Sequence, residues 1–272
     1  MNTGYQNLHT HTTYCDGSLP PEAMIKAAIR KGCGSIGFSE HSYIVFDTYY
    51  SMDLDVTDDY ISELNALREK YSDSIEVFVG LEQDYLTETV PGNLDFVIGS
   101  VHYVPKDGEF VSVDAGPKHQ KMMIDTYFGG DYYEMAEDYF EVVAGIIKKT
   151  NADIVGHFDL AAKYNFNGNL FNEKHPRYVS AALSAMDEIL KDCRLFEINT
   201  GAMFRFNKPG PYPAVFLLKE LRARGGEVIL SSDSHDAESI CFKFYEMQEL
   251  LKTCGFKYMK RLTKDGFVDV KL

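Results

Sequence analysis

The chain of 272 residues is 45% hydrophobic and has a formal net charge of −14, from 41 acidic and 27 basic side chains. Such a negative field repels polyanions, and since the sequence has no concentrated basic stripe, we expect no nucleic-acid partner. No run of about 18 apolar residues is present, so we expect no membrane span, and the first residues do not resemble a secretory signal. Five cysteines without a Cys-x-x-Cys pair are typical of reduced thiols, which favours a cytoplasmic protein. The charge balance favours a small substrate.

Helical patterns and short apolar runs alternate along the chain. The first helical pattern opens at Pro20-Pro21 and ends at Gly32. Further helices are predicted over Asp58–Asp73, Tyr132–Lys149, Pro176–Lys191, Ala214–Arg224 and Glu238–Thr253. Strand-like runs, such as Leu195–Asn199, lie between them. Strands that alternate with helices form parallel βα units, and about seven such units favour a closed α/β barrel over an open sheet.

The segment 105–130 interrupts this alternation. It is polar, contains glycines and is only weakly patterned. We therefore predict one barrel domain over residues 1–272, with a loop insert around 105–130 over the mouth of the barrel. Loops at this position commonly carry specificity.

Nearly every strand-like run ends in a side chain that can bind a metal ion. In chain order these ends are His9-Thr10-His11, Glu40-His41, Glu82, His102, His157 and Asp233-Ser234-His235. A parallel barrel gathers the C-terminal ends of its strands around one mouth. His9 and His11 are spaced to share one face of a strand, and so are Asp233 and His235. Only one of the neighbours Glu40 and His41 can point inward; we expect His41 inside and Glu40 against the helices.

Two carboxylates complete the candidate set. Glu82 has two oxygens that could bridge two cations, and Asp16 lies in a turn that can bend back over the mouth. Nine candidate ligands are too many for one zinc ion, which takes about four. They suit three ions, and imidazole combined with carboxylate favours Zn, Fe or Mn. His119 and His175 lie in loop or helix-start contexts, and we interpret both as structural or surface residues.

The number of candidate ligands distinguishes a metal site from polar residues that have no metal-binding role. A single His-x-His is weak evidence, because a histidine in a strand is more often a satisfied polar residue. Burying nine ionisable groups together, however, costs free energy unless cations neutralise them. The complete set therefore predicts a metal site.

The order of the motifs resembles the polymerase and histidinol phosphatase (PHP) superfamily across essentially the whole chain. The motifs are His-x-His, Ser-Glu-His, Gly-Leu-Glu, Gly-Ser-Val-His, Gly-His-Phe-Asp and Ser-Asp-Ser-His. The longer stretches Gly80–Tyr85, Asp95–His102 and Glu197–Gly201 are similar to its histidinol-phosphatase branch. The resemblance implies a distorted (β/α)7 TIM-like barrel that holds three metal ions. It implies one ion on His9, His11, Glu82 and Asp233, a second on Glu82, His102 and His157, and a third on Asp16, His41 and His235.

The reaction that this resemblance implies is hydrolysis of a phosphate monoester, with L-histidinol phosphate of histidine biosynthesis as the expected substrate. Hydroxide held between two ions would attack, and the third ion would bind phosphoryl oxygens and the leaving alkoxide. Arg205 is the expected bidentate phosphate clamp, with Lys163 and Arg177 as further candidates. Asp159, on the same face as His157, would orient that ligand or transfer a proton to the leaving oxygen.

Three alternatives stay open. The same metal site could act on another phosphorylated metabolite or a nucleotide. A metal-dependent amidohydrolase is also a barrel with His-x-His on its first strand, but such enzymes often bridge two ions with a modified lysine, and no lysine stands at the ends near Glu82 and His102. The third alternative is a metal-stabilised binding module without activity. The segments Tyr43–Tyr50 and Tyr103–Asp114 could read the imidazole and amine of the substrate; the native metal and the oligomeric state stay undefined by the sequence.

Overall fold

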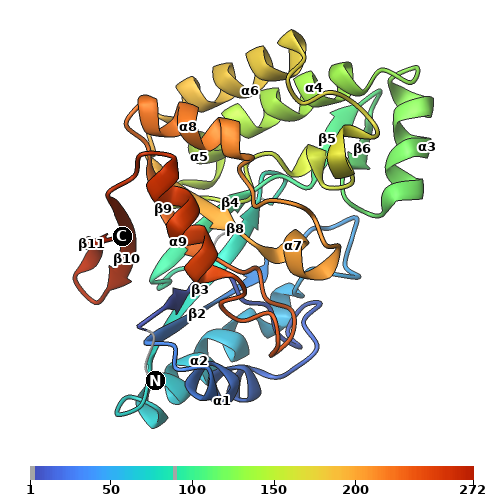
Figure 1. Ribbon diagram of the computed structural model, residues 1–272. Coiled ribbons are helices and arrows are strands. Elements are labelled where there is room, and N and C mark those ends of the chain that lie inside the picture. Colours follow the sequence, from blue (N-terminus) through green and yellow to red (C-terminus); the bar gives the residue numbers. More distant parts are fainter. Residues whose placement is uncertain (1–3, 88–90) are drawn as a thin grey trace.

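Seven parallel strands form a nearly closed barrel in the computed structural model, which describes residues 4–87 and 91–272 (Figure 1). In sheet order the strands are β1 (Gln6–Asn7), β2 (Ser35–His41), β3 (Glu76–Asp84), β4 (Phe96–Ser100), β7 (Ile154–Val155), β8 (Leu195–Asn199) and β9 (Glu227–Ser231). This confirms the predicted α/β barrel of seven units.

The barrel closes where the first strand meets the last, a contact that we call the β1–β9 seam. Beyond the ends of both strands, Thr10 forms a parallel bridge with Ser234. The His11 N–H donates to the Ser234 carbonyl (2.8 Å), and the Ser234 N–H donates to the His9 carbonyl (3.0 Å). The seam therefore lies directly beside four of the predicted metal ligands.

Helices cover the outside of the barrel. They are α1 (Pro21–Arg30), α2 (Thr57–Lys70), α4 (Tyr132–Ala144), α5 (Ile146–Thr150), α6 (Pro176–Ile189), α8 (Val215–Ala223) and α9 (Phe244–Thr253). Short turns of 3-10 helix occupy η1 (Leu54–Val56), η2 (Leu160–Ala162) and η3 (Phe166–Gly168), and α7 (Gly201–Arg205) follows β8. The six predicted helices are present; most bounds differ by three residues or fewer, and two differences are larger.

The first difference is a break at Gly145, which divides the predicted Tyr132–Lys149 helix into α4 and α5. A Cβ atom at Gly145 would lie 3.2 Å from the Tyr85 ring, so the break sits at a close contact. The second difference is the start of α9, six residues later than predicted. Asp236 accepts hydrogen bonds from the Glu238 and Ser239 N–H groups, which holds this segment in a turn before the helix.

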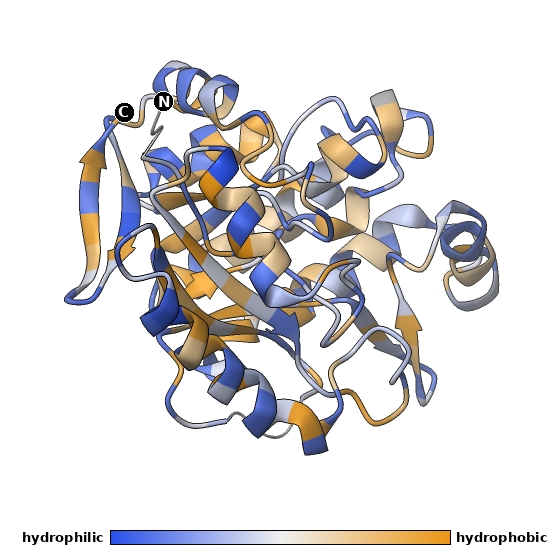
Figure 2. Ribbon diagram, turned by 90° about the horizontal axis from the view of Figure 1, so that it is seen from below, coloured by the Kyte–Doolittle hydropathy of each residue, from blue (hydrophilic) through white to orange (hydrophobic). Residues whose placement is uncertain are grey.

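The inside of the barrel is filled by apolar side chains below the mouth. One buried cluster joins Leu8, Phe78, Phe96, Ile98, Ile154, Leu195 and Ile229. The Phe96 ring packs over Gly80, where a Cβ atom would lie 2.4 Å from the ring. Figure 2 shows apolar and neutral residues along the central strands, whereas the surrounding helices alternate apolar and hydrophilic segments. The barrel is therefore a packed core and not a pore.

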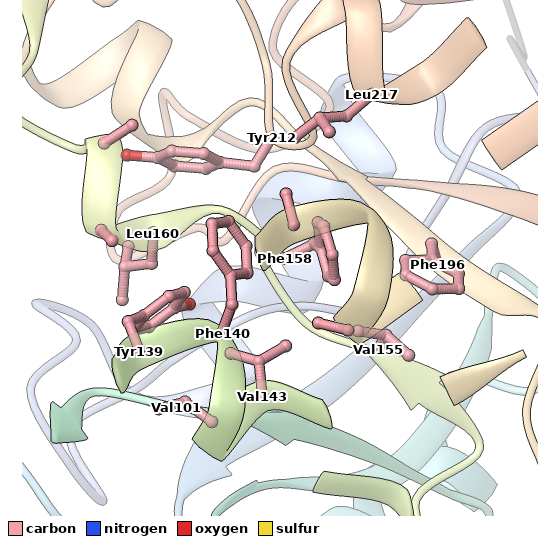
Figure 3. Packing of buried hydrophobic residues seen from close by; sticks show 14 of the residues in the cluster. Val101, Tyr139, Phe140, Val143, Val155, Phe158, Leu160, Phe196, Tyr212 and Leu217 are labelled. Atoms are coloured by element: carbon pink, nitrogen blue, oxygen red, sulfur yellow. The ribbon is translucent and has the colours of Figure 1, made fainter. Parts of the chain in front are cut away.

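The outer face of the later strands packs against α4 and α6 in the largest buried cluster. The Phe140 ring of α4 lies 5.4 Å from the ring of Phe158 and 5.4 Å from that of Tyr178 on α6. Figure 3 shows Phe140 beside Phe158, with Leu160 and Tyr212 close by. Phe158 and Leu160 follow His157 in the chain, so their burial fixes the segment that carries this histidine.

The segment expected as a loop insert has more secondary structure than its sequence suggested. Strands β5 (Tyr103–Lys106) and β6 (Glu109–Ser112) pair as an antiparallel hairpin, and α3 (Pro117–Tyr127) follows. Asp107 and Gly108 connect the two strands, both with positive φ. Asp-Gly is a preferred pair for such a two-residue turn. Val111, Val113, Met123 and Ile124 join the largest core cluster, which explains why the insert is ordered.

A second hairpin, β10 (Tyr258–Thr263) with β11 (Gly266–Lys271), covers the end of the barrel opposite the mouth. The Gln6 side-chain amide donates to the Leu262 carbonyl (2.9 Å) and accepts from the Leu262 N–H (2.7 Å). Leu262 and Phe267 close the apolar interior at this end. Of the helices in the described ranges, none is long and apolar enough to cross a membrane. All five cysteines lie in these ranges and are free thiols.

Candidate metal centre

Strand alternation determines which side chains reach the mouth. On β3, Val77, Val79 and Leu81 pack outward in the cluster beneath α1 and α2. The intervening residues face the interior: Phe78 belongs to the inner cluster and Glu82 lies further along, at the mouth. Similarly, Ile36 and Phe38 of β2 face outward, which brings His41 inside. The same alternation that fills the core therefore presents the ligand candidates.

Glu82 is the centre of the cluster. Its Oε2 lies 2.8 Å from His41 Nδ1, 3.2 Å from His9 Nε2 and 3.5 Å from His11 Nε2. Its Oε1 lies 2.9 Å from His157 Nε2 and 3.8 Å from His102 Nε2. The two oxygens therefore face two different groups of imidazoles, as a carboxylate between two cations would.

The remaining two carboxylates connect the last motif to the first. Asp233 Oδ1 lies 3.4 Å from His11 Nε2 and 3.8 Å from His9 Nε2. Asp16 Oδ1 lies 3.2 Å from His235 Nε2 and 3.7 Å from His41 Nε2. All nine predicted side chains thus lie in one continuous cluster.

The residues fit a set of metal ions. Three combinations of the predicted ligands keep one ligand atom from each member within 4.8 Å of the others: His9, His11 and Asp233; His41, Glu82 and His102; and His11, Asp16, His41 and His235. A fourth combination, His11 with Cys15 and Glu40, includes two side chains that are not predicted ligands. His9 Nε2, His11 Nε2 and Glu82 Oε2 are buried and have no hydrogen-bond partner in the described part of the chain. Buried polar atoms without a partner are costly, and a cation among them would remove that cost.

Electrostatics favour ionised carboxylates at this centre. Burial acts to raise the pKa of Glu82, but His9 and His41 outweigh it and hold the pKa well below its usual range. The pKa of His11 is lowered by burial and by His235 and His41, so its imidazole is neutral, the form that binds metals. Burial would also lower the pKa of His102, but Asp84 and Glu82 raise it to about 9, so a metal ion would compete with a proton there.

Two carboxylates outside the predicted set, Glu197 and Asp84, hold the imidazoles of His9 and His102 in place. Glu197 lies 2.8 Å from His9 Nδ1 and accepts hydrogen bonds from the His157 N–H (2.6 Å) and the Ser231 hydroxyl (2.5 Å). Asp84 lies 3.0 Å from His102 Nδ1 and accepts from the His102 N–H (3.1 Å). Each carboxylate contacts Nδ1 of its histidine, so that Nε2 of the same ring faces Glu82. Asp84 lies two residues beyond Glu82 on the same face of the strand, a signal that the sequence contained.

Asp233 has an unusual backbone conformation, with φ of +46°. Left-handed conformations are uncommon for residues other than glycine, although Asp and Asn tolerate them best, and they often occur at functional sites. The Arg205 guanidinium lies 2.9 Å from Asp233 Oδ2 and also contacts His235. Asp233 therefore uses one oxygen toward His9 and His11 and the other toward Arg205.

The other predicted site residues have separate surroundings. Lys163 lines the mouth cavity and pairs with Asp114 (Nζ to Oδ2, 2.9 Å). The buried Asp159 accepts a hydrogen bond from the Ala214 N–H (3.1 Å), and the described hydrogen bonds include none to His157. Asp159 thus holds the segment before α8, and burial raises its pKa to about 6.

Three further residues lie away from the ligand cluster, and a fourth, Glu40, lies directly behind it. Arg177 was a wrong candidate for the phosphate clamp, because its guanidinium pairs with Asp131 and Glu137 on the outer face of α6. His119 is exposed on α3, and His175 caps α6 by accepting the Arg177 N–H. Glu40 is buried, accepts from the Thr12 N–H and hydroxyl, and has an oxygen within 4.8 Å of a ring nitrogen of His11.

A cavity of about 390 Å³ lies over the cluster. Its floor includes Asp16, His41, His102, His157, Asp233 and His235, and its walls include Arg205, Phe206, Lys163, Asp114, Asp47, Tyr49, Tyr50 and Tyr103. Cations, carboxylates and aromatic rings therefore surround one space. Ser112, Asp114 and Ala115 bring the insert into its lining.

A parallel barrel with histidines and carboxylates gathered at its mouth belongs to the class of α/β-barrel proteins built to hold metal ions. Residues 7–201 match the model of the PHP domain. This chain therefore belongs to the PHP domain family, as the order of its motifs predicted.

Relatives match over nearly the whole length. A Deinococcus radiodurans protein named "Probable histidinol-phosphatase" is 28% identical over 268 residues, which cover 93% of this chain and 95% of that protein. The Bacillus subtilis protein named "Histidinol-phosphatase" is 25% identical, over 87% of this chain and 95% of its own. The crystal structure of histidinol phosphate phosphatase from Lactococcus lactis superposes with a TM-score of 0.73 at 21% identity, covering 97% of this chain and 99% of that one. That likeness confirms the fold.

Proposed function

We propose that this protein is a metal-dependent phosphomonoesterase that hydrolyses L-histidinol phosphate to L-histidinol and phosphate, a step of histidine biosynthesis. The observation that carries the proposal is the Glu82 carboxylate, buried between two groups of imidazoles beneath a cavity that also exposes Arg205 and Lys163. The names of the relatives support this substrate, and the L. lactis protein was solved in complex with zinc, L-histidinol and phosphate.

Three divalent transition metal ions per chain, Zn, Fe or Mn, are part of the proposal. One ion would be held by His9, His11, Glu82 and Asp233, a second by Glu82, His102 and His157, and a third by Asp16, His41 and His235. When bound, such ions supply a nucleophile from water at neutral pH and stabilise charge that develops on phosphoryl oxygens. The orphaned buried atoms of His9, His11 and Glu82 support this assignment.

The chain's own residues orient the site. Glu197 and Asp84 fix the ring orientation of His9 and His102, because each occupies one ring nitrogen and leaves the other toward the cluster. Arg205 is the proposed phosphate clamp, since its guanidinium lines the cavity beside Asp233 and His235, its present partners, and a guanidinium can bind a phosphate through two parallel N–H donors. Lys163 would add a second cation for the phosphate. The buried Asp159 would act as a positioning residue, because it holds the segment before α8.

The test is phosphate release from L-histidinol phosphate, beside a panel of other phosphorylated metabolites and nucleotides, on protein with quantified metal content. Strong preference for L-histidinol phosphate with two to three ions per chain is the expected result. Equal, weak activity across the panel would mean that the protein is a phosphomonoesterase whose preferred substrate is another monoester. A fully metal-loaded protein that releases no phosphate from any monoester would refute the proposed activity.

A further inference from the structure

An ion pair lies in the wall of the mouth cavity, outside the ligand cluster. Lys163 Nζ and Asp114 Oδ2 are 2.9 Å apart, and the two side chains are only 11% and 22% exposed. Lys163 follows η2, whereas Asp114 lies in the insert, between β6 and α3. The pair therefore joins the insert to the barrel at the place where a substrate would enter.

The position of Asp114 is fixed by contacts other than its charge. The Ser112 hydroxyl donates to Asp114 Oδ1 (3.1 Å), and the Tyr164 hydroxyl donates to the Asp114 carbonyl. Gln120 of α3 donates to the carbonyls of Val113 and Ala161, which ties the same segment to η2. The carboxylate would thus stay in place if Lys163 turned toward another partner.

This arrangement has a consequence for any phosphorylated ligand. A phosphate in the cavity attracts Lys163, and Asp114 then loses its cation while it remains mostly buried. A buried charge without a partner costs free energy, so a ligand that supplies only negative charge binds at a penalty. A ligand with a cation beside its phosphate removes the penalty, because it replaces both halves of the ion pair.

We propose that Asp114 is a specificity-determining residue that binds an ammonium group on the carbon next to the ester CH₂ of the substrate. This inference rests on the proposed phosphomonoesterase function and names the residue that would recognise the amine of its substrate. L-histidinol phosphate has this pattern of phosphate and neighbouring ammonium. Tyr50 and Tyr103 line the same cavity and would face the rest of the substrate.

Asp47, the other carboxylate of the cavity wall outside the ligand cluster, is less suited to this role. Asp47 Oδ2 accepts a hydrogen bond from the Tyr103 hydroxyl (2.6 Å), and Asp47 Oδ1 accepts from the Tyr49 N–H (3.4 Å). Asp47 has no cation in the described ion pairs, whereas Asp114 already binds an ammonium, that of Lys163. The geometry for recognising an ammonium group therefore exists at Asp114.

The experiment measures kcat/KM for matched pairs of esters on metal-loaded wild-type protein and on Asp114→Asn. One pair is L-histidinol phosphate and its analogue with hydrogen in place of the amine; the other is O-phosphoethanolamine and ethyl phosphate. Wild-type protein should prefer the amine-bearing member of each pair. Asp114→Asn should reduce that preference about tenfold or more, since a charge-assisted hydrogen bond is lost. The ratio is taken within one preparation, so it does not depend on how much of the variant is folded.

Asp125→Asn is the matched control. Asp125 belongs to the same insert and also pairs with a lysine, Lys121 (2.7 Å), but its side chain is 54% exposed on α3. The control should keep the wild-type preference. A preference unchanged in Asp114→Asn would mean that Asp114 only holds Lys163, and it would overturn the inference. Wild-type protein that hydrolyses both members equally would also overturn it while the phosphomonoesterase function stands; wild-type protein that hydrolyses none would refute that function and the inference together.

Discussion

Five imidazoles lie within 4 Å of the Glu82 carboxylate, and this single residue explains why the surrounding charges are tolerated in the barrel. Each carboxylate of the cluster has a histidine beside it, and two more carboxylates, Glu197 and Asp84, stand behind the histidines. The site is therefore a two-layer network in which the outer layer orients the inner one.

Replacement of Asp233 by asparagine tests the inner layer. Asn is nearly isosteric and tolerates the left-handed φ of +46°, so the fold should persist. The amide of asparagine has no negative charge with which to bind a metal ion, so kcat should fall by more than about a hundredfold. Turnover and metal content are measured together with the circular dichroism spectrum. Near-normal turnover with full metal content would remove Asp233 from the ligand set.

Replacement of Glu197 by glutamine tests the outer layer. The variant should bind metal about ten- to a hundredfold more weakly, because the hydrogen bond that orients His9 loses its charge. Competition with a chelator of known affinity gives the metal affinity directly. Glu188→Gln on α6, whose carboxylate pairs with Lys148 and Lys191 at the surface, is the control and should bind metal as the wild type does. Equal affinities in both variants would contradict the role of Glu197.

At the residue scale, the sequence predicted side chains that share a strand face and missed partners that meet only in three dimensions. The nine ligand candidates follow from alternation along strands and from the common mouth of a parallel barrel. Asp84, two residues beyond Glu82 on the same strand, carries the same signal. Glu197 and Asp114 act through residues 188 and 49 positions away in the chain, and no local pattern reveals such pairs. Arg177 failed as a candidate because a lone arginine in a helix has no signature that separates a surface ion pair from a phosphate clamp.

Strand β3 is the element that combines the core with the site. Its inward residues change from Phe78 through Gly80 to Glu82, so that one strand contributes to the barrel floor and to the mouth. Gly80 is required between them because the Phe96 ring of β4 occupies the space of its missing side chain. The register of the neighbouring strands therefore depends on this close contact.

Gly80→Ala should destabilise the protein by about 1–3 kcal/mol, because the added methyl group would overlap the Phe96 ring and force it to move. The free energy of unfolding is measured in urea. Gly210→Ala is the matched control, since nothing lies within 4 Å of its added Cβ atom and its φ is not positive. If both variants unfolded at the same urea concentration, the inner packing described for β3 and β4 would be wrong.

At the element scale, six helices and the number of βα units followed from apolar periodicity, whereas the two hairpins and α3 did not. Asp107-Gly108 is a recognisable turn signal between β5 and β6, but the polar composition of the segment hid it. Most residues of β10 and β11 are half-buried and only Leu262 is fully buried, so these strands lack the alternation of buried and exposed positions that marks an amphipathic strand.

The whole molecule should depend on bound metal for part of its stability. Ions that bind only the folded state stabilise it by RT ln(1 + [L]/Kd), or about 2.7 kcal/mol at a hundredfold excess over Kd. Chelation should therefore lower the thermal unfolding midpoint. A metal ion must displace the proton of His102, whose pKa is raised to about 9, so the difference between loaded and chelated protein should narrow as the pH falls below that value. Thermal unfolding across this pH range checks both statements, and equal midpoints at neutral pH would contradict them.

At the β1–β9 seam, a bound metal ion would connect the first and last strands of the barrel. β1 contributes only two residues to the sheet, and the polar contacts that close the barrel join groups as far as 227 positions apart. An ion shared by His9, His11 and Asp233 would act as a reversible cross-link across almost the entire chain, equivalent in polymer terms to circularising it. Cross-links that close such long loops restrict the unfolded ensemble most strongly. Loss of the ion would thus convert a ring into a linear chain that can fray from its first strand, and amide hydrogen exchange should detect that opening first in β1 and β9.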